Sequence, residues 1–287
     1  MRNLSRRRCL FAGSALLAGG ARAAQSGQLT ARQVIARIQE HVQVPWRTET
    51  VDVFKAGNPD TTVKGIATTF MATLACLQRA AGSGKNLIVT HEPAFWNHLD
   101  RTADLAGDPI YRDKQDFIRK NDLVVWRFHD HWHAHRPDGI FLGFNKAMGW
   151  QKYQDGDNQM LYNLPPTTLE AVAKELHDRL KLRSMRLIGD PRTKITKIAA
   201  GAHDLGRNRI ILTGVDALVV PEAREWESIE YIRDAVAMGQ KKGLILLAHQ
   251  SVEEPGMDEC AKWLRTFIPE VPVEFVPSGE PFWRPGN

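Results

Sequence analysis

A histidine-rich stretch, residues 123–135, constrains this chain more than any other segment. It begins with an apolar, β-branched run at residues 123–126, which is typical of a buried strand. The polar residues that follow are His129, Asp130, His131, His133 and His135. Four of the chain's ten histidines therefore fall within seven residues. Imidazole and carboxylate together are the ligand set of zinc, manganese, iron or nickel. Taken alone, the stretch fits either a metal site or a solvated loop that binds nothing.

Two other segments repeat this pattern of an apolar strand followed by histidine and carboxylate. Apolar runs at 87–90 and 244–248 predict two further buried strands. The polar residues at or after their ends are His91, Glu92, His249 and Glu253. In open α/β sheets, ligands bind beyond the carboxyl ends of parallel strands. A single histidine after a strand is more often structural, but three such strands with matched chemistry predict one metal centre.

Residues 1–23 are predicted to be a cleaved targeting segment. Arg6 and Arg7 lie in a pattern that resembles a twin-arginine export signal, and an apolar run at 10–17 follows it. A small-x-small cleavage site predicts cutting after Ala23. The alternative is a retained N-terminal anchor, but the run is too short and too rich in Ala and Gly to span a bilayer permanently. We therefore expect a periplasmic or secreted protein.

Removal of this segment changes the charge balance. The chain has 38 Lys and Arg against 33 Asp and Glu, but residues 1–23 hold five arginines and no acid. The mature chain of 264 residues is therefore formally neutral, with 33 residues of each sign. A nucleic-acid partner is not expected without a basic surplus, and no later run is apolar enough for a stable membrane span. Cys76 and Cys260, the cysteines that remain, are too few for a disulfide scaffold, and whether they pair stays open.

The mature chain is long enough for one large domain or two smaller ones. Alternating strand and helix patterns up to about residue 150 predict an α/β domain. The composition restarts near a proline linker at 164–166, with a capped helix and three short strands after it. We expect 24–161 and 229–287 to form one discontinuous α/β metal-binding domain with a shared sheet. Residues 162–228 would then be an inserted α+β domain.

The order of these elements resembles the NIF3-like dinuclear metal-centre family, also called the GTP cyclohydrolase 1 type 2 family. The residues that carry the resemblance are His91-Glu92-Pro93, the Asp130 segment with Gly143-Phe144-Asn145 after it, and Ala248-His249 with Glu253. The resemblance covers most of residues 50–287. It implies two α/β domains, two divalent transition metal ions in the cleft between them, and a ring-shaped hexamer. The substrate stays open, because the biochemical role of the family is poorly settled.

Two positions depart from the family pattern. Where the family has two adjacent histidines, this chain has His91 followed by Glu92. A carboxylate there should favour manganese or iron over zinc. The middle segment is also denser in histidine than the family pattern, so which of its residues are ligands stays open. We favour Asp130, with His131 as the replacement for the missing imidazole.

The expected function is metal-assisted hydrolysis of a small molecule. The predicted metal ligands are His91, Glu92, Asp130, His131, His249 and Glu253. Two metals about 3.5–4 Å apart could hold a bridging hydroxide and polarise a phosphoryl, amide or ring C=N group, with one carboxylate bridging. No serine or cysteine nucleophile motif competes with this interpretation.

The alternative is a non-catalytic protein that binds or delivers metal, or a ring-forming scaffold. An open coordination position would favour catalysis, and a fully ligated metal would favour a structural role.

Overall fold

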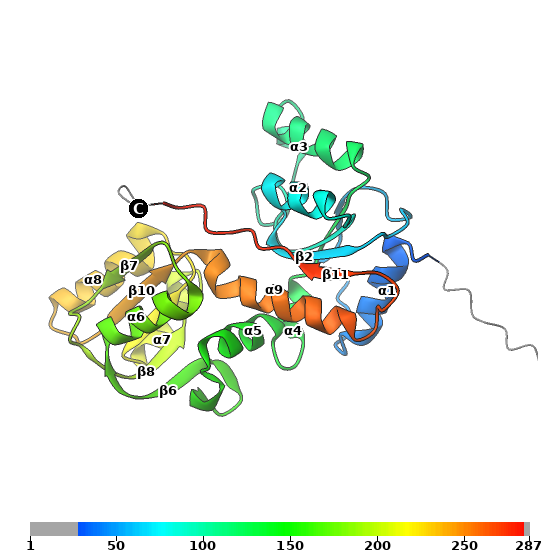
Figure 1. The fold of residues 1–287 in the computed structure, drawn as a ribbon. Coiled ribbons are helices and arrows are strands. Elements are labelled where there is room, and N and C mark those ends of the chain that lie inside the picture. Colours follow the sequence, from blue (N-terminus) through cyan, green and yellow to red (C-terminus); the bar gives the residue numbers. More distant parts are fainter. Residues whose placement is uncertain (1–27, 284–287) are drawn as a thin grey trace, which may run out of the picture.

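The computed structural model describes residues 28–283, so the predicted targeting segment at 1–23 lies outside the described residues. The chain forms two α/β lobes, and the long helix α9 (His249–Arg265) runs between them (Figure 1). We call the lobe built on the first sheet the first lobe, and the lobe built on the second sheet the second lobe. The expected mixed α/β fold with two units is confirmed. None of the helices within residues 28–283 combines the length and apolar character that crossing a bilayer requires.

The first lobe is built on a five-stranded sheet with the order β1-β4-β3-β2-β11. Its strands are β1 (Phe54–Ala56), β2 (Ile66–Met71), β3 (Leu87–Glu92), β4 (Val124–Arg127) and β11 (Val273–Phe275). All neighbours pair in parallel except β1, which is antiparallel to β4 at the edge. Helices α1 (Ala31–His41) and α9 cover one face, while α2 (Leu74–Gly82) and α3 (Pro109–Lys120) cover the other. Because both faces are covered, the central strands are apolar almost throughout.

The second lobe is built on a six-stranded sheet with the order β5-β6-β8-β9-β10-β7. Its strands are β5 (Gln154–Asp155), β6 (Asn158–Thr168), β7 (Met185–Ile188), β8 (Lys194–Ala200), β9 (Ala217–Val220) and β10 (Gly243–Leu247). The three strands β8, β9 and β10 are parallel. Helix α6 (Leu169–Leu180) packs on one face of the sheet. Helices α7 (Leu205–Thr213) and α8 (Glu230–Ala237) pack on the other face, and a π-helix at Glu225–Ile229 leads into α8.

The sheet topology contradicts the expectation that the segments before and after 162–228 share one sheet. Strand β10 pairs with β9 and β7 in the second sheet, apart from β3. Only β11 returns to the first sheet, where it pairs with β2. The physical reason is the short connection through α8, which places two successive parallel strands side by side in one sheet. The expectation failed because it assumed that strands bearing ligands must be neighbours, whereas here two sheets direct their carboxyl ends toward the same space.

Helix α9 begins earlier than its proline suggests. Proline is favoured in the first turn of a helix, but α9 starts at His249 and Pro255 lies inside it. His249 and Glu253 are therefore four residues apart on one helix, and such side chains lie on the same face. The helix packs closely against α5 (Gly139–Met148), since a Cβ at Gly143 would lie 2.2 Å from the Pro255 carbonyl oxygen. This close approach fixes the position of α9 relative to α5.

The segment after β11, residues 276–283, returns from the first lobe to the second (Figure 1). We call it the C-terminal strap. The backbone N–H and the hydroxyl of Ser278 donate to the Glu254 carboxylate of α9. The Glu280 carboxylate accepts from the Arg183 backbone N–H at 2.7 Å and from the Ser184 hydroxyl. The strap is thus fixed to the helix between the lobes and to the second lobe.

Candidate metal centre

Histidine and glutamate side chains from both lobes meet at the start of α9. The residues that the first lobe supplies are His91 and Glu92 at the end of β3, and His129 and His133 around α4 (Asp130–Ala134). The second lobe supplies His203 after β8 and Glu222 after β9, and α9 supplies His249 and Glu253. Three sets have ligand atoms within 4.8 Å of one another: His91, His129 and His133; His91, Glu92 and Glu253; and His203, His249 and Glu253. These residues are the candidate metal centre.

The three first-lobe imidazoles are each oriented through Nδ1. His91 Nδ1 lies 3.1 Å from the Phe128 carbonyl oxygen. His129 Nδ1 lies 2.9 Å from Asp130 Oδ1, and His133 Nδ1 lies 2.9 Å from Asp138 Oδ2. Carbonyl and carboxylate oxygens only accept, so Nδ1 carries the proton on each ring. The lone pair of Nε2 is then left for a metal. This arrangement is typical of metal-binding histidines, whose second nitrogen is fixed by an acceptor.

Glu253 lies between the two groups of imidazoles. Its Oε2 is 3.3 Å from His91 Nε2, and its Oε1 is 3.0 Å from His249 Nε2. Within residues 28–283, His91 Nε2, His249 Nε2 and Glu253 Oε2 are buried without a partner in hydrogen-bonding geometry. Buried polar atoms without partners are costly, and a cation among them would satisfy all three. The residues present therefore fit a metal site, with Glu253 between its two groups of imidazoles.

The ionisation of the site also fits a cation. Burial lowers the pKa of His91 to about 3, so this imidazole is neutral, which is the form that binds metal. Burial also works against the charged form of His249, but the charge of Glu253 and the side-chain contact with Glu222 raise its pKa to about 10. Burial disfavours the carboxylate of Glu253, yet the nearby His249 charge holds its pKa well below the usual value. Without a metal, the proton on His249 is what compensates the buried carboxylate.

Glu92 is held in place by a buried arginine. Arg127 donates through Nη2 to Glu92 Oε2 at 3.3 Å and through Nε to the His91 carbonyl oxygen at 2.9 Å. The other carboxylate oxygen, Oε1, lies 3.5 Å from His129 Nε2. Burial, together with the charge of Glu253, raises the pKa of Glu92. Arg127 therefore fixes the strand end that carries both ligand candidates.

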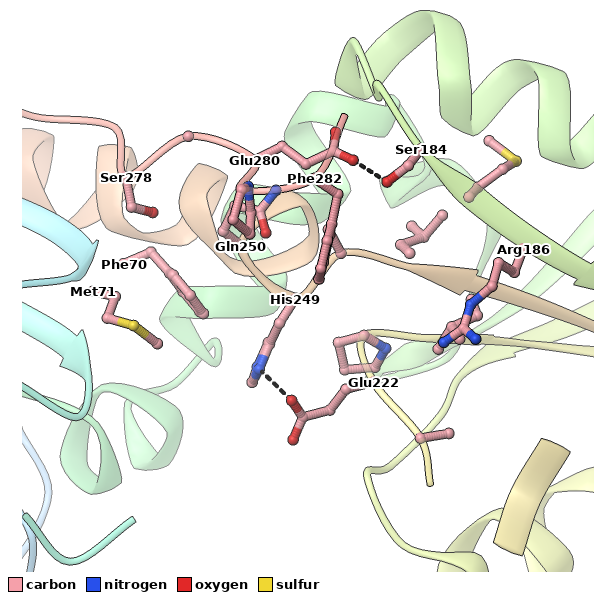
Figure 2. A pocket seen from close by; sticks show the side chains of 18 of the residues that line it. Phe70, Met71, Ser184, Arg186, Glu222, His249, Gln250, Ser278, Glu280 and Phe282 are labelled. Atoms are coloured by element: carbon pink, nitrogen blue, oxygen red, sulfur yellow. Dashed lines mark hydrogen bonds and ion pairs between the residues drawn. The ribbon is translucent and has the colours of Figure 1, made fainter. Parts of the chain in front are cut away.

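The second-lobe side of the centre is open. Glu222 lies 3.5 Å from His249 Nδ1 and 3.5 Å from His203 Nδ1 (Figure 2 shows the contact with His249). The rings of His203 and His249 are 4.7 Å apart. The side chains of His203 and Glu222 are 48% and 62% exposed, so solvent or a substrate can reach this side.

Asp130 does not join the cluster, contrary to our expectation. Its Oδ1 bonds to His129, and its Oδ2 accepts from the Thr50 hydroxyl at 2.8 Å and the Val51 N–H at 3.2 Å. Both oxygens are thus engaged away from the other ligand candidates. Asp130 is placed to position His129.

His131 is also directed away from the cluster. Its Nδ1 bonds to Asp52 Oδ2 at 2.6 Å, and its Nε2 accepts from the Arg47 backbone N–H at 3.0 Å. The ring stacks on Trp46 with 3.6 Å between centroids. The chain turns into α4 at Asp130. In a helix, residues four apart share a face and residues two apart do not, so His131 lies apart from His129 and His133, contrary to our expectation.

The structure thus brings together His91, Glu92, His249 and Glu253 from the predicted set and leaves out Asp130 and His131. His129 and His133, left open by the sequence, take their places. His203 was missed, as was Glu222 beside it. A signal was present in the sequence, because the apolar segments that form β8 and β9 are also followed by a histidine and a glutamate.

Two α/β lobes with a histidine and glutamate cluster between them define a candidate metal-binding protein. The family model Duf34/NIF3 (NGG1p interacting factor 3) matches residues 29–281, and the chain belongs to this family. No curated protein sequence matches the chain.

Solved structures show the same fold. The Staphylococcus aureus hypothetical protein SA1388 is 19% identical, with a TM-score of 0.69, and the match covers 89% of this chain and 99% of that one. A Bacillus cereus protein related to NIF3 is 13% identical, with a TM-score of 0.68 over 89% and 99% of the two chains. Reduced HcgD from Methanocaldococcus jannaschii is 13% identical, with a TM-score of 0.61 over 86% and 98%. At these identities the likeness concerns the fold.

Proposed function

We propose that this protein holds two divalent transition metal ions and hydrolyses a small molecule. The observation that carries the proposal is the placement of Glu253, with one oxygen toward His91 and the other toward His249. His91, His129 and His133 would hold one ion, and His203 and His249 the other. Glu253 would bridge them.

The metals, when bound, would polarise the scissile group and lower the pKa of a water. The chain's own residues supply orientation. The Nδ1 partners of His91, His129 and His133 keep the three Nε2 atoms directed inward. Arg127 holds Glu92 beside His91, where it would act as a further ligand. A carboxylate at this position favours manganese or iron over zinc.

Access to the site supports catalysis over a purely structural metal. A cavity of about 810 Å³ borders His249 and Glu222 on the exposed side of the cluster. A volume of this size suits a small-molecule ligand. A scaffold or metal-storage role would need no such cavity beside the ligands.

Metal counting combined with hydrolysis assays tests the proposal. Protein purified without added metal should contain manganese, iron, zinc or nickel, approaching two ions per chain after reloading. A panel of phosphodiesters, esters, amides and cyclic imines should include a compound whose hydrolysis stops with a chelator and returns with metal. Metal-free protein that hydrolyses as fast as loaded protein would contradict the proposal. Loaded protein with no hydrolysis of any class would favour the non-catalytic alternative.

We also propose export and hexamer formation, which rest on the sequence pattern and the family resemblance. The mature N-terminus should be Ala24 outside the cytoplasm, and changing Arg6 and Arg7 to Lys should leave precursor inside the cell. Intact residues 1–23 in the mass spectrum of the native protein would contradict export. Light scattering that gives the mass of six chains would support the ring.

A further inference from the structure

The cavity beside the candidate metal centre has mainly apolar walls. Both lobes and the C-terminal strap contribute to it (Figure 2). The apolar lining residues include Phe70, Met71, Met185, Pro221, Ala223 and Phe282. The Phe70 ring also meets the His249 ring edge-on at 5.0 Å, so the apolar wall continues up to a metal ligand candidate. A compound that filled this cavity would place one end at the cluster and its body against hydrocarbon.

In the part of the cavity away from His249, the charged side chains disfavour a phosphate-rich ligand. Among the cavity-lining residues that the structure describes, Arg186 is the one lysine or arginine, and its Nη1 already donates to Glu225 Oε1 at 2.8 Å. Two carboxylates, Glu222 and Glu280, also line the space. Anionic ligands are recognised by free cations or clusters of N–H donors. Away from His249 and the candidate metal centre, a polyphosphate would meet the like charge of Glu280 and an arginine that is already paired.

The C-terminal strap brings an aromatic ring to this cavity. Glu254 accepts from Ser278, and Glu280 accepts from Arg183 and Ser184, so both ends of the 278–280 segment are fixed. Phe282 follows two residues later and lines the cavity although it is 59% exposed. In Figure 2 its side chain extends from the strap toward the His249 side of the cavity. An exposed aromatic ring at the mouth of an apolar cavity is suited to covering a bound apolar ligand.

We propose that the cavity binds an uncharged, largely apolar small molecule whose hydrolysable polar end faces His249 and Glu253, with Phe282 covering its apolar body. The proposal rests on the proposed hydrolytic function for the role of the polar end. Its core, the chemical class of the ligand, depends only on the walls. A nucleoside triphosphate is the wrong class for these walls, whereas a neutral aromatic or long-chain ester or amide is the right one.

Binding of the uncharged fluorescent probe N-phenyl-1-naphthylamine to the full chain tests this. The probe should bind saturably at one site per chain, in loaded and in metal-free protein alike, because the walls contain no metal. Phe282→Ala should weaken binding by about fivefold, as expected when part of one aromatic contact is lost. Phe282→Leu should restore most of the affinity. Trp226→Ala is the matched control, since Trp226 is 76% exposed but does not line the cavity, and it should bind like the wild type.

The outcomes separate this proposal from the proposed function. Neutral naphthyl esters should displace the probe, and GTP at equal concentration should not. Any of three results would overturn the assignment. These are a lack of saturable probe binding, binding of the probe to Phe282→Ala with wild-type affinity, and displacement of the probe by GTP as effectively as by the ester. Probe binding in a protein that takes up no metal on reloading would refute metal-dependent hydrolysis and leave the cavity assignment standing. Metal-dependent hydrolysis restricted to nucleotides would refute the apolar ligand class and leave the proposed hydrolytic function standing.

Discussion

Replacing Asp130 by asparagine tests whether Asp130 positions His129 or is itself a metal ligand. In the structure, Asp130 Oδ1 lies 2.9 Å from His129 Nδ1, while Oδ2 accepts from Thr50 and Val51. An asparagine has one accepting oxygen and one donating NH₂ group in the same space. If its oxygen stays with the Val51 N–H, its NH₂ group faces His129 Nδ1. The imidazole must then carry its proton on Nε2, the atom that would bind the metal.

The size of the effect follows from this tautomer conflict. His129 keeps its place in the chain but loses the acceptor that holds Nε2 unprotonated. Loss of such a partner typically weakens metal binding by about 10–100-fold. This corresponds to about 1.4–2.7 kcal/mol of binding free energy. The number of metals bound at saturation should not change.

Competition with a chromophoric chelator measures the affinity, and elemental analysis measures the stoichiometry. Asp216→Asn is the matched control, because Asp216 also accepts from backbone N–H groups but does so in the second lobe, at Thr196 and Lys197. That variant should bind metal like the wild type. If Asp130→Asn lost a metal even at saturation, Asp130 would be a ligand, as the sequence alone suggested. If its affinity were unchanged, the bond to His129 would have no positioning role.

The candidate centre supports three other predictions. The double variant His249→Ala with Glu253→Ala should remove bound metal and abolish any hydrolysis, and a full metal content by elemental analysis would show the assignment of α9 to be wrong. His203→Ala should lower the affinity for one of the two metals, because His203 belongs to the set with His249 and Glu253 and not to the set with His129 and His133; equal weakening of both steps in a calorimetric titration would argue against two distinct sets. In metal-free protein the pKa of His249 is raised from 6.5 to about 10, so the stabilisation from its charged form is complete below pH 6.5 and is lost as the pH rises through about 10. The melting temperature of metal-free protein should therefore fall between about pH 7 and pH 10, and a flat profile would contradict the raised pKa.

Local sequence patterns determined the elements and the kind of chemistry. The apolar runs at 87–90, 124–126 and 244–247 are strands in the structure, as their composition predicts. His91, Glu92, His249 and Glu253 follow directly from the strand-then-ligand pattern. These inferences succeed because strand formation and the position of a side chain after a strand depend on neighbours in sequence.

Tertiary structure decided which of these elements became neighbours. The sequence of β10 is equally compatible with either sheet, and its short connection from β9 through α8 placed it in the second. The two sheets could still supply one site, because α9 starts at the end of β10 and packs against the first lobe.

The tertiary structure also determined which residues of the histidine-rich stretch face the candidate metal centre. The four histidines and the aspartate of this stretch are all potential metal ligands, and the sequence does not rank them. Helix α4 places His129 and His133 on one face, and Asp52 and Arg47 engage both nitrogens of His131 on another. The sequence thus predicted a candidate set of metal ligands, while the backbone turn at Asp130 and partners far along the chain determined which members face the candidate centre.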